Sequence, residues 1–170
     1  LKLYQPEILP AGDSAIVLRW GKEIDGKVHG FIQTLMMDFA ENPLDGVIEW
    51  IPAYHSLTAV YDPIKLSHLL KRTSGLYDYM KQSIGTRLDQ CEADPVTRQK
   101  RIHTIPVCYG GDYGPDLEEV AQYHNLAVEE VIDLHSKPNY QVYMLGFVPG
   151  FPYLGGLNES IATPRKKTPR

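Results

Sequence analysis

The sequence predicts an α+β fold with two domains. Two segments carry apolar residues at every third or fourth position, which indicates helices, and several runs of β-branched and aromatic residues between turn signals indicate strands. Residues 92–101 are polar and charged, contain Pro95 and show no periodicity, which is typical of a boundary. We therefore expect a first domain at residues 1–91, a linker at 92–101 and a second domain at 102–170.

The first domain begins with a predicted strand pair. Residues 2–9 and 14–20 have strand composition, and the turn-forming residues 10–13 separate them. A helix is expected next, because apolar residues from Ile24 to Phe39 follow the spacing of one buried face and Asn42-Pro43 stops the pattern.

A second strand pair and a second helix complete this domain. The strands are predicted at residues 46–53 and 56–61, with a tight connection between them. Asp62-Pro63 combines a good N-cap with a residue suited to the first helical position, so a helix starts there, and Gly75 kinks or divides it. Both helices are expected on one face of the sheet.

The second domain opens with a strand predicted at residues 102–107, followed by a loop and two short helices. Asp116 is placed to cap the first helix, with Glu119 as in a capping box, and the second helix runs through 128–135. The pair resembles a DNA-binding helix-turn-helix, but residues 116–133 hold no Lys or Arg to contact phosphates.

The most informative stretch is residues 140–157, which contain no charged residue. A largely buried strand is predicted at 140–148, followed by a loop stiffened by Pro149 and Pro152. The loop displays three aromatic side chains, Phe147, Phe151 and Tyr153. Either these aromatics fill a core at a sheet corner, or they form a rigid apolar recognition surface.

Charge and composition exclude several classes. The net charge is −4, and without the four cations among the last six residues the remaining 13 basic and 21 acidic residues give −8, which disfavours a general nucleic-acid surface. There is no apolar run long enough to span a bilayer and no export signal, and the two cysteines are isolated. A cytoplasmic location is therefore expected.

The residues offer few self-contained catalytic sets. The six histidines are scattered without ligand spacing, so no metal site is predicted, and no nucleophile signature occurs. The loop from Tyr109 to Asp112, with Gly110 and Gly111, could present backbone N–H groups to an anion. Arg165 follows a rigid Thr-Pro turn suited to carboxylate or phosphate, with a solvated linker as the alternative.

Several long motifs together resemble one family. They are IPVCYGGDYGPDL at 105–117, YMLGFVPGFPYLGG at 143–156, ATPR at 162–165, GDSA at 12–15 and EWIPAYHSL at 49–57. The chain is identified by them as a member of the family that comprises allophanate hydrolase subunit 1, the B subunit of 5-oxoprolinase and the Kip-type inhibitor of the sporulation histidine kinase.

The resemblance implies an N-terminal α+β domain followed by a cyclophilin-like β-barrel. Family chains continue past the ATPR segment into further strands, so the barrel is expected to be truncated at its C-terminus, with exposed sheet edges. Bacterial members act with a homologous partner, of the type of allophanate hydrolase subunit 2 or the C subunit of 5-oxoprolinase, and with a third 5-oxoprolinase subunit. The implied complex opens 5-oxoproline to glutamate with ATP, and this subunit is expected to be inactive alone.

Site residues follow from residue type and family position. Asp112 and Arg165 are the predicted catalytic residues. The predicted substrate-binding or partner-binding residues are Tyr109, Gly110, Gly111, Phe147, Pro149, Gly150, Phe151, Pro152 and Tyr153. The alternative function is inhibition of histidine-kinase autophosphorylation through docking of the aromatic loop on the kinase dimerisation bundle. Prolyl isomerase activity would rest on fold analogy alone.

Overall fold

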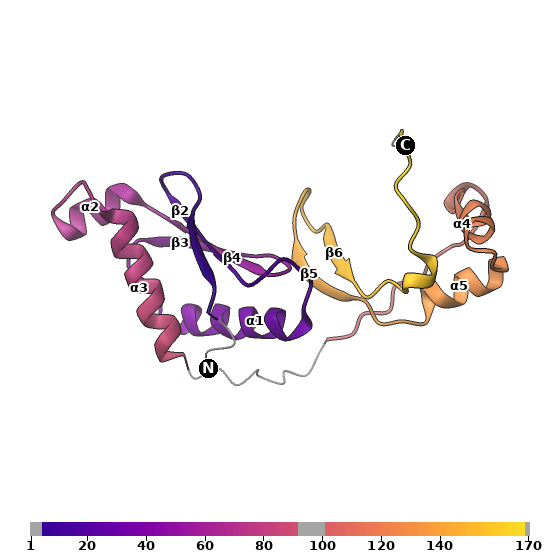
Figure 1. Ribbon diagram of the computed structural model, residues 1–170, viewed down its shortest axis with the longest axis horizontal. Helices are drawn as coiled ribbons and strands as arrows, with labels where there is room; N and C mark the ends of the chain where they lie inside the picture. The colour runs from indigo at the N-terminus through magenta and orange to yellow at the C-terminus, as the bar shows by residue number, and fades with distance from the viewer. Residues whose placement is uncertain (1–4, 92–100, 169–170) are drawn as a thin grey trace. The chain divides into compact units, whose positions relative to one another are not determined.

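A computed structural model describes residues 5–91 and 101–168 of the chain. The chain forms two compact units, Leu1–Arg98 and Gln99–Arg170 (Figure 1). The predicted linker lies outside the described residues, apart from Arg101. Within the described ranges, no helix has the length and apolar composition needed to cross a bilayer.

The first unit contains a four-stranded antiparallel sheet. Its strands are β1 (Glu7–Pro10), β2 (Ala15–Arg19), β3 (Val47–Pro52) and β4 (Ser56–Tyr61), in the order β1-β2-β4-β3. The two predicted strand pairs are therefore present, and the β2–β4 pairing brings them into one sheet. Of the first predicted strand, residues 7–9 lie in β1 and residues 5–6 do not, whereas Lys2 to Tyr4 lie outside the described residues.

Three helices accompany the sheet: α1 (Gly26–Glu41), α2 (Pro63–Leu70) and α3 (Leu76–Gln90). The side chain of Asp62 accepts hydrogen bonds from the N–H groups of Ile64 and Lys65, both at 2.9 Å, which confirms the predicted cap. Gly75 adopts φ of 69° between α2 and α3, so it divides the predicted second helix into two.

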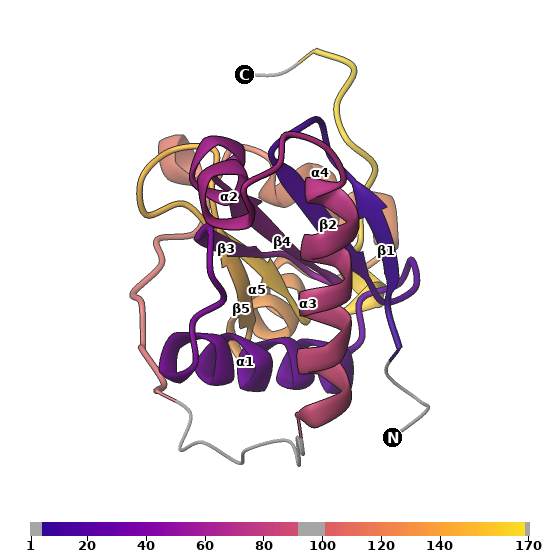
Figure 2. The same cartoon turned by 90° about the vertical axis from the view of Figure 1, so that its left-hand side faces the viewer.

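The core of this unit lies on one face of the sheet, the face that α1 and α3 cover (Figure 2). Ile16 pairs with Ala59 and Leu18 with Leu57, and all four side chains are buried in this core. The ring of Phe39 on α1 stacks on Trp50 of β3, with centroids 3.9 Å apart. The expectation that the helices cover a single sheet face is therefore confirmed.

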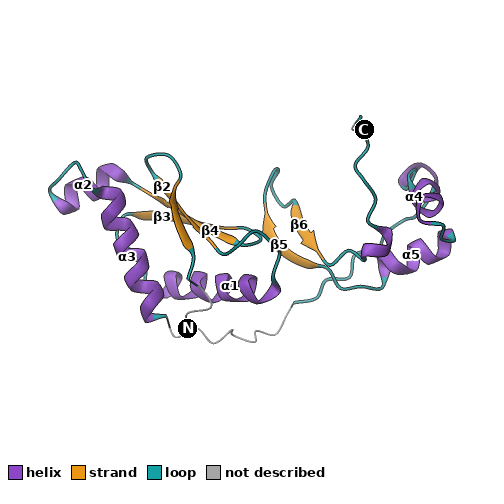
Figure 3. Cartoon of the chain, in the orientation of Figure 1, coloured by secondary structure: helices purple, strands orange, loops and turns teal. Residues whose placement is uncertain are grey.

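The second unit consists of short elements. After a 3-10 turn, η2 (Gly111–Tyr113), come α4 (Leu117–His124) and α5 (Val128–Ser136), then the strands β5 (Gln141–Leu145) and β6 (Pro152–Gly155), and finally η3 (Glu159–Ile161) (Figure 3). The strands form one antiparallel hairpin. Ala121, Val131 and Ile161 form a small core that joins α4, α5 and η3.

Several expectations for this unit were wrong. Residues 102–107 form no strand, and Ile102 and Ile105 are 73% and 75% exposed. The strand predicted at 140–148 is limited to β5, and its outward side chains, such as Leu145, are exposed rather than buried. The expectation of a truncated cyclophilin-like barrel stays a prediction, because the only sheet in residues 101–168 is two-stranded and a closed barrel requires a continuous ring of paired strands.

The start of α4 is where the sequence predicts it, but its cap differs. Asp116 occupies the N-cap position without a side-chain capping hydrogen bond, and its Oδ1 instead lies 2.6 Å from Nζ of Lys166. At the start of α5, by contrast, the backbone N–H of Ala127 donates to Oε2 of Glu130 at 2.8 Å.

Candidate functional site

Tyr109 is fixed against the end of α5. Its hydroxyl lies 2.6 Å from Nδ1 of His135, and the two rings meet edge to face. The hydroxyl of Tyr140 donates to the backbone carbonyl of His135 at 2.7 Å, and burial, with a smaller contribution from Tyr109, raises the pKa of Tyr140. His135 thus organises two phenols, a role that sequence reasoning did not assign to it.

The loop that follows Tyr109 is a tight turn. Gly110 and Gly111 have φ of 79° and 55°, and the N–H of Gly114 donates to the carbonyl of Gly110 at 3.1 Å. A Cβ on Gly114 would lie 2.5 Å from the Gly110 nitrogen, so glycine is required there. Asp112 projects from η2 with its side chain exposed, which leaves its carboxylate accessible to a ligand.

The tip of the β5–β6 hairpin has a defined backbone. The N–H of Phe151 donates to the carbonyl of Val148 at 3.0 Å around Pro149 and Gly150, and Gly150 has φ of 78°. Proline followed by a residue of positive φ is the pattern of a type II turn. The N–H of Gly146 closes the tip by donating to the carbonyl of Phe151 at 3.0 Å. The tip is therefore a preorganised loop.

This hairpin displays its aromatic side chains. Phe147 is 88% exposed and adopts φ of 60°, an unfavourable region for a bulky residue. Ring centroids lie 5.9 Å apart between Phe147 and Phe151 and 5.4 Å apart between Phe151 and Tyr153. Five further apolar side chains of residues 142–157 are exposed: Val142, Leu145, Val148, Leu154 and Leu157. We call these aromatic and apolar residues the hairpin surface; the exposure of Phe147 and Phe151 favours the recognition interpretation, whereas Tyr153 is half-buried.

The tail after β6 is anchored along α4. Ile161 is buried against Ala121 and Val131, and Oγ1 of Thr163 lies 3.1 Å from Nε2 of His124. Lys166 Nζ lies 2.6 Å from Asp116 Oδ1 and 2.6 Å from Glu119 Oε2. Residues 162–168 are exposed, as the solvated-linker alternative expects, but Thr163 and Lys166 are held by these contacts.

Arg165 lies within this anchored tail. Its side chain is exposed, and no hydrogen bond or ion pair engages it within residues 5–91 and 101–168. Its neighbour Lys166 contacts Asp116 at the beginning of α4, and Asp112 lies four residues before Asp116 in the chain. The predicted residues thus form two groups: one at the N-terminal end of α4 and one on the hairpin surface.

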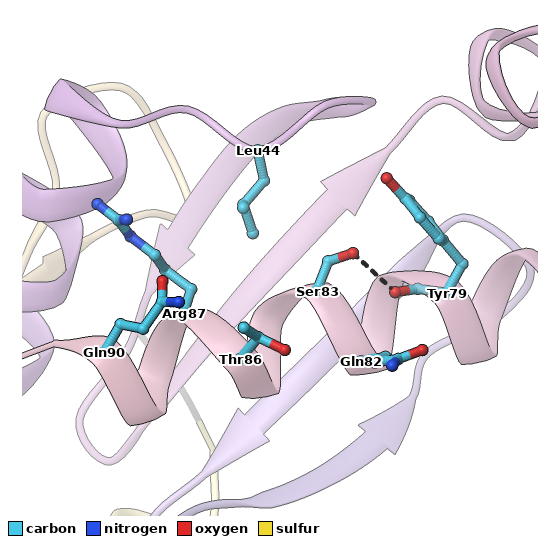
Figure 4. Close-up of a pocket in the computed structure, with 7 residues that line it drawn as sticks. All are labelled: Leu44, Tyr79, Gln82, Ser83, Thr86, Arg87 and Gln90. Carbon is cyan, nitrogen blue, oxygen red and sulfur yellow. Dashed lines mark hydrogen bonds between the residues drawn. The ribbon is translucent and has the colours of Figure 1, made fainter.

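A separate hollow of about 440 Å³ lies on the first unit, along α3 (Figure 4). It is lined by Leu44, Tyr79, Gln82, Ser83, Thr86, Arg87 and Gln90. Its cation, Arg87, forms a two-pronged ion pair with Asp38, with Nε–Oδ2 and Nη2–Oδ1 both at 2.7 Å. None of the predicted site residues lines this hollow. In the described part of the chain, no three His, Cys, Asp or Glu side chains gather as a metal site would need.

The sequence is similar to a known protein family. Residues 6–170 match the model of the carboxyltransferase domain, subdomain C and D. The B subunit of the 5-oxoprolinase of Bacillus subtilis is 47% identical over 98% of this chain and 69% of its own length. That of Escherichia coli O157:H7 is 34% identical over 94% of this chain and 67% of its own length.

A solved structure agrees with this relationship. The crystal structure of TTHA0988 superposes with a TM-score of 0.69 and 33% sequence identity, over 92% of this chain. The match spans 28% of the TTHA0988 chain. Since the family model covers nearly all of the sequence, the chain belongs to the carboxyltransferase subdomain C and D family, together with the 5-oxoprolinase B subunits that its motifs resemble.

Proposed function

We propose that this protein is a non-autonomous subunit of an ATP-dependent 5-oxoprolinase. It would act with a homologous partner of the C-subunit type and with a third subunit to hydrolyse the lactam of 5-oxoproline to glutamate. The observation that carries the proposal is the similarity to 5-oxoprolinase B subunits over nearly the whole chain, at 47% identity in one of them.

The chemistry explains the need for ATP. A lactam carbonyl is a poor electrophile, because the nitrogen lone pair is delocalised into it. Transfer of the γ-phosphoryl group to the lactam oxygen would remove that stabilisation, so that water can add to the carbon. This first water then loses a proton, and the C–N bond breaks with protonation of the amine, which leaves an acyl phosphate. A second water hydrolyses the acyl phosphate to the carboxylate of glutamate and inorganic phosphate, while ADP is the other product of the phosphoryl transfer.

Two residues of this chain are suited to parts of that reaction. The exposed guanidinium of Arg165 would hold an anionic group, either the substrate carboxylate or a phosphate. The carboxylate of Asp112 would accept the proton of the attacking water. Tyr109 and the two glycines would shape the loop that presents Asp112.

The hairpin surface would bind the homologous partner. Phe147, Phe151 and the apolar side chains of this surface are exposed, and the type II turn at its tip is formed before a partner arrives. A protein partner gains affinity from a rigid loop because less conformational entropy is lost on binding.

A second candidate function is inhibition of a histidine kinase. The same hairpin surface favours it, because exposed aromatics on a preorganised loop can dock in the groove between helices of a dimerisation bundle. Both functions can belong to one protein, and they require different assays: hydrolysis of 5-oxoproline for the first, autophosphorylation of the kinase for the second.

The catalytic assignments are tested with the full-length protein mixed with its two partner subunits. ATP-dependent glutamate release from 5-oxoproline is measured for wild type, Arg165→Ala and Asp112→Asn, with Lys167→Ala as the matched control. The control changes an exposed neighbouring cation. We expect at least a tenfold loss with Arg165→Ala and Asp112→Asn and near wild-type release with Lys167→Ala.

Assembly of each mixture is checked by gel filtration, so that a loss of activity is not a loss of the complex. Wild-type release by an assembled Arg165→Ala complex would remove Arg165 from the reaction, and the same result with Asp112→Asn would remove Asp112.

A further inference from the structure

Three contacts anchor the tail at successive points along α4. Ile161 packs in the small core, Thr163 contacts His124 near the end of α4, and Lys166 binds Asp116 and Glu119 at its beginning. The tail therefore runs along α4 from its C-terminal end to its N-terminal end.

Arg165 stands between the last two anchors. Thr163 precedes it by two residues and Lys166 follows it directly, so its backbone is held on both sides while its guanidinium stays exposed. Pro164 removes further freedom, because its ring fixes φ. A residue held in this way loses less conformational entropy when it binds an anion than a residue of a free tail would lose.

The Lys166 contact is also an electrostatic arrangement. Asp116 and Glu119 are acidic groups at the beginning of α4, and Nζ of Lys166 lies between them, 2.6 Å from an oxygen of each. The contact with Asp116, and to a smaller extent the contact with Glu119, raises the pKa of the Lys166 ammonium group.

We propose that Lys166 is a positioning residue: by bridging Asp116 and Glu119 it orders the tail on α4 and keeps Arg165 free to bind the anionic group of the substrate or phosphate. The inference rests on the proposed function for the identity of the anion. The contacts of Lys166 with Asp116 and Glu119 involve residues of this chain alone.

Lys167 provides a matched control. It is the same residue type one position further on, it is exposed, and within the described ranges it makes no ion pair or hydrogen bond. The full-length variants Lys166→Met, Lys166→Arg and Lys167→Met are therefore compared with wild type in two measurements.

The first measurement uses the full-length protein without its partners. Steady-state heteronuclear ¹⁵N NOE values are recorded for the backbone amides of residues 163, 165 and 166. Lys166→Met should lower all of them to values typical of a free tail, while Lys167→Met leaves them at wild type and Lys166→Arg preserves them. Unchanged values in Lys166→Met would overturn the inference, whatever activity the complex has.

The second measurement uses the assembled complex. With Lys166→Met we expect the KM for ATP or for 5-oxoproline to rise roughly two- to tenfold with little change in kcat, and Lys166→Arg to restore it. A mobile tail with both KM values unchanged would also overturn the positioning role. If the wild-type complex released no glutamate, the proposed function would fail. The NMR comparison would still show whether Lys166 orders the tail on α4.

Discussion

The hydroxyl of Tyr109 lies 2.6 Å from Nδ1 of His135, although the two residues are 26 positions apart. The contact ties the loop that carries Asp112 to the end of α5. The hydroxyl of Tyr140 approaches the backbone carbonyl of the same histidine. Loop, helix and hairpin are thus joined around one imidazole.

Tyr109→Phe tests this link. It removes the hydroxyl and leaves Nδ1 of His135 without its donor or acceptor, so we expect a loss of roughly 1 kcal/mol in the free energy of unfolding. Amide hydrogen exchange at residues 110–114 should also accelerate. Tyr113→Phe is the control, because that side chain is 83% exposed. Equal exchange rates in the two variants would show that the contact does not hold the loop.

Phe147→Asn should weaken binding of the partner without lowering the stability of the fold. Asparagine tolerates positive φ better than phenylalanine, so relief at φ of 60° should leave the unfolding free energy unchanged or raise it by up to about 1 kcal/mol. The same change removes the most exposed ring of the hairpin surface. Titration calorimetry with the homologous partner should show at least a tenfold weaker affinity. Wild-type affinity in this folded variant would exclude Phe147 from the interface.

Two glycines of the first unit should respond oppositely to alanine. A Cβ on Gly46 would lie 2.4 Å from Cδ2 of the buried Leu66, at φ of 86°, so Gly46→Ala should cost roughly 2–4 kcal/mol. Gly85 lies inside α3 with no atom within 4 Å of the added Cβ, so Gly85→Ala should stabilise by about 0.5–1 kcal/mol. Urea unfolding measures both, and effects of the same sign would contradict the packing described for α3 and Leu66.

Burial lowers the pKa of His29 on α1. The folded state therefore holds this imidazole neutral at pH values where the unfolded chain, with its ordinary pKa of 6.5, already binds a proton. Below pH 6.5 the unfolded state binds more protons, so the unfolding free energy should fall on acidification, by at most about 1.4 kcal/mol per pH unit from this group.

Denaturant unfolding of wild type, His29→Gln and His103→Gln between pH 5 and 7 measures this contribution. His103 is exposed and serves as the control. The slope against pH should be smaller in His29→Gln than in the other two proteins. Identical slopes in all three would assign the acid sensitivity to other groups.

The helices of the first unit were predicted well because their starts, breaks and buried faces depend on residues that are close together in the sequence. The cap at Asp62, the break at Gly75 and the apolar stripe of α1 each depend on residues within a few positions of one another. Strand composition at residues 102–107 was misleading, because a strand needs a partner and the described structure pairs none with that segment.

The site residues were predicted from motifs, whereas their contacts were not. Lys166 reaches Glu119 across 47 positions, and a run of basic residues gives no sign of which of them will find a carboxylate. The contact of His135 with Tyr109 could not be predicted either, since histidines are common at helix ends and the sequence does not show which side chain they contact. By contrast, the charge-free stretch with its Pro-Gly turn did indicate the exposed aromatic hairpin, as one of two alternatives.

The most direct test of the central claim is ATP-dependent glutamate release from 5-oxoproline by the full-length protein and its two partner subunits, compared with mixtures that omit each component in turn. We predict release only from the complete mixture with ATP, and none when this protein is left out. Undiminished release without this protein, or no release from a complex shown to be assembled, would contradict the account; the latter result would make kinase autophosphorylation the next assay.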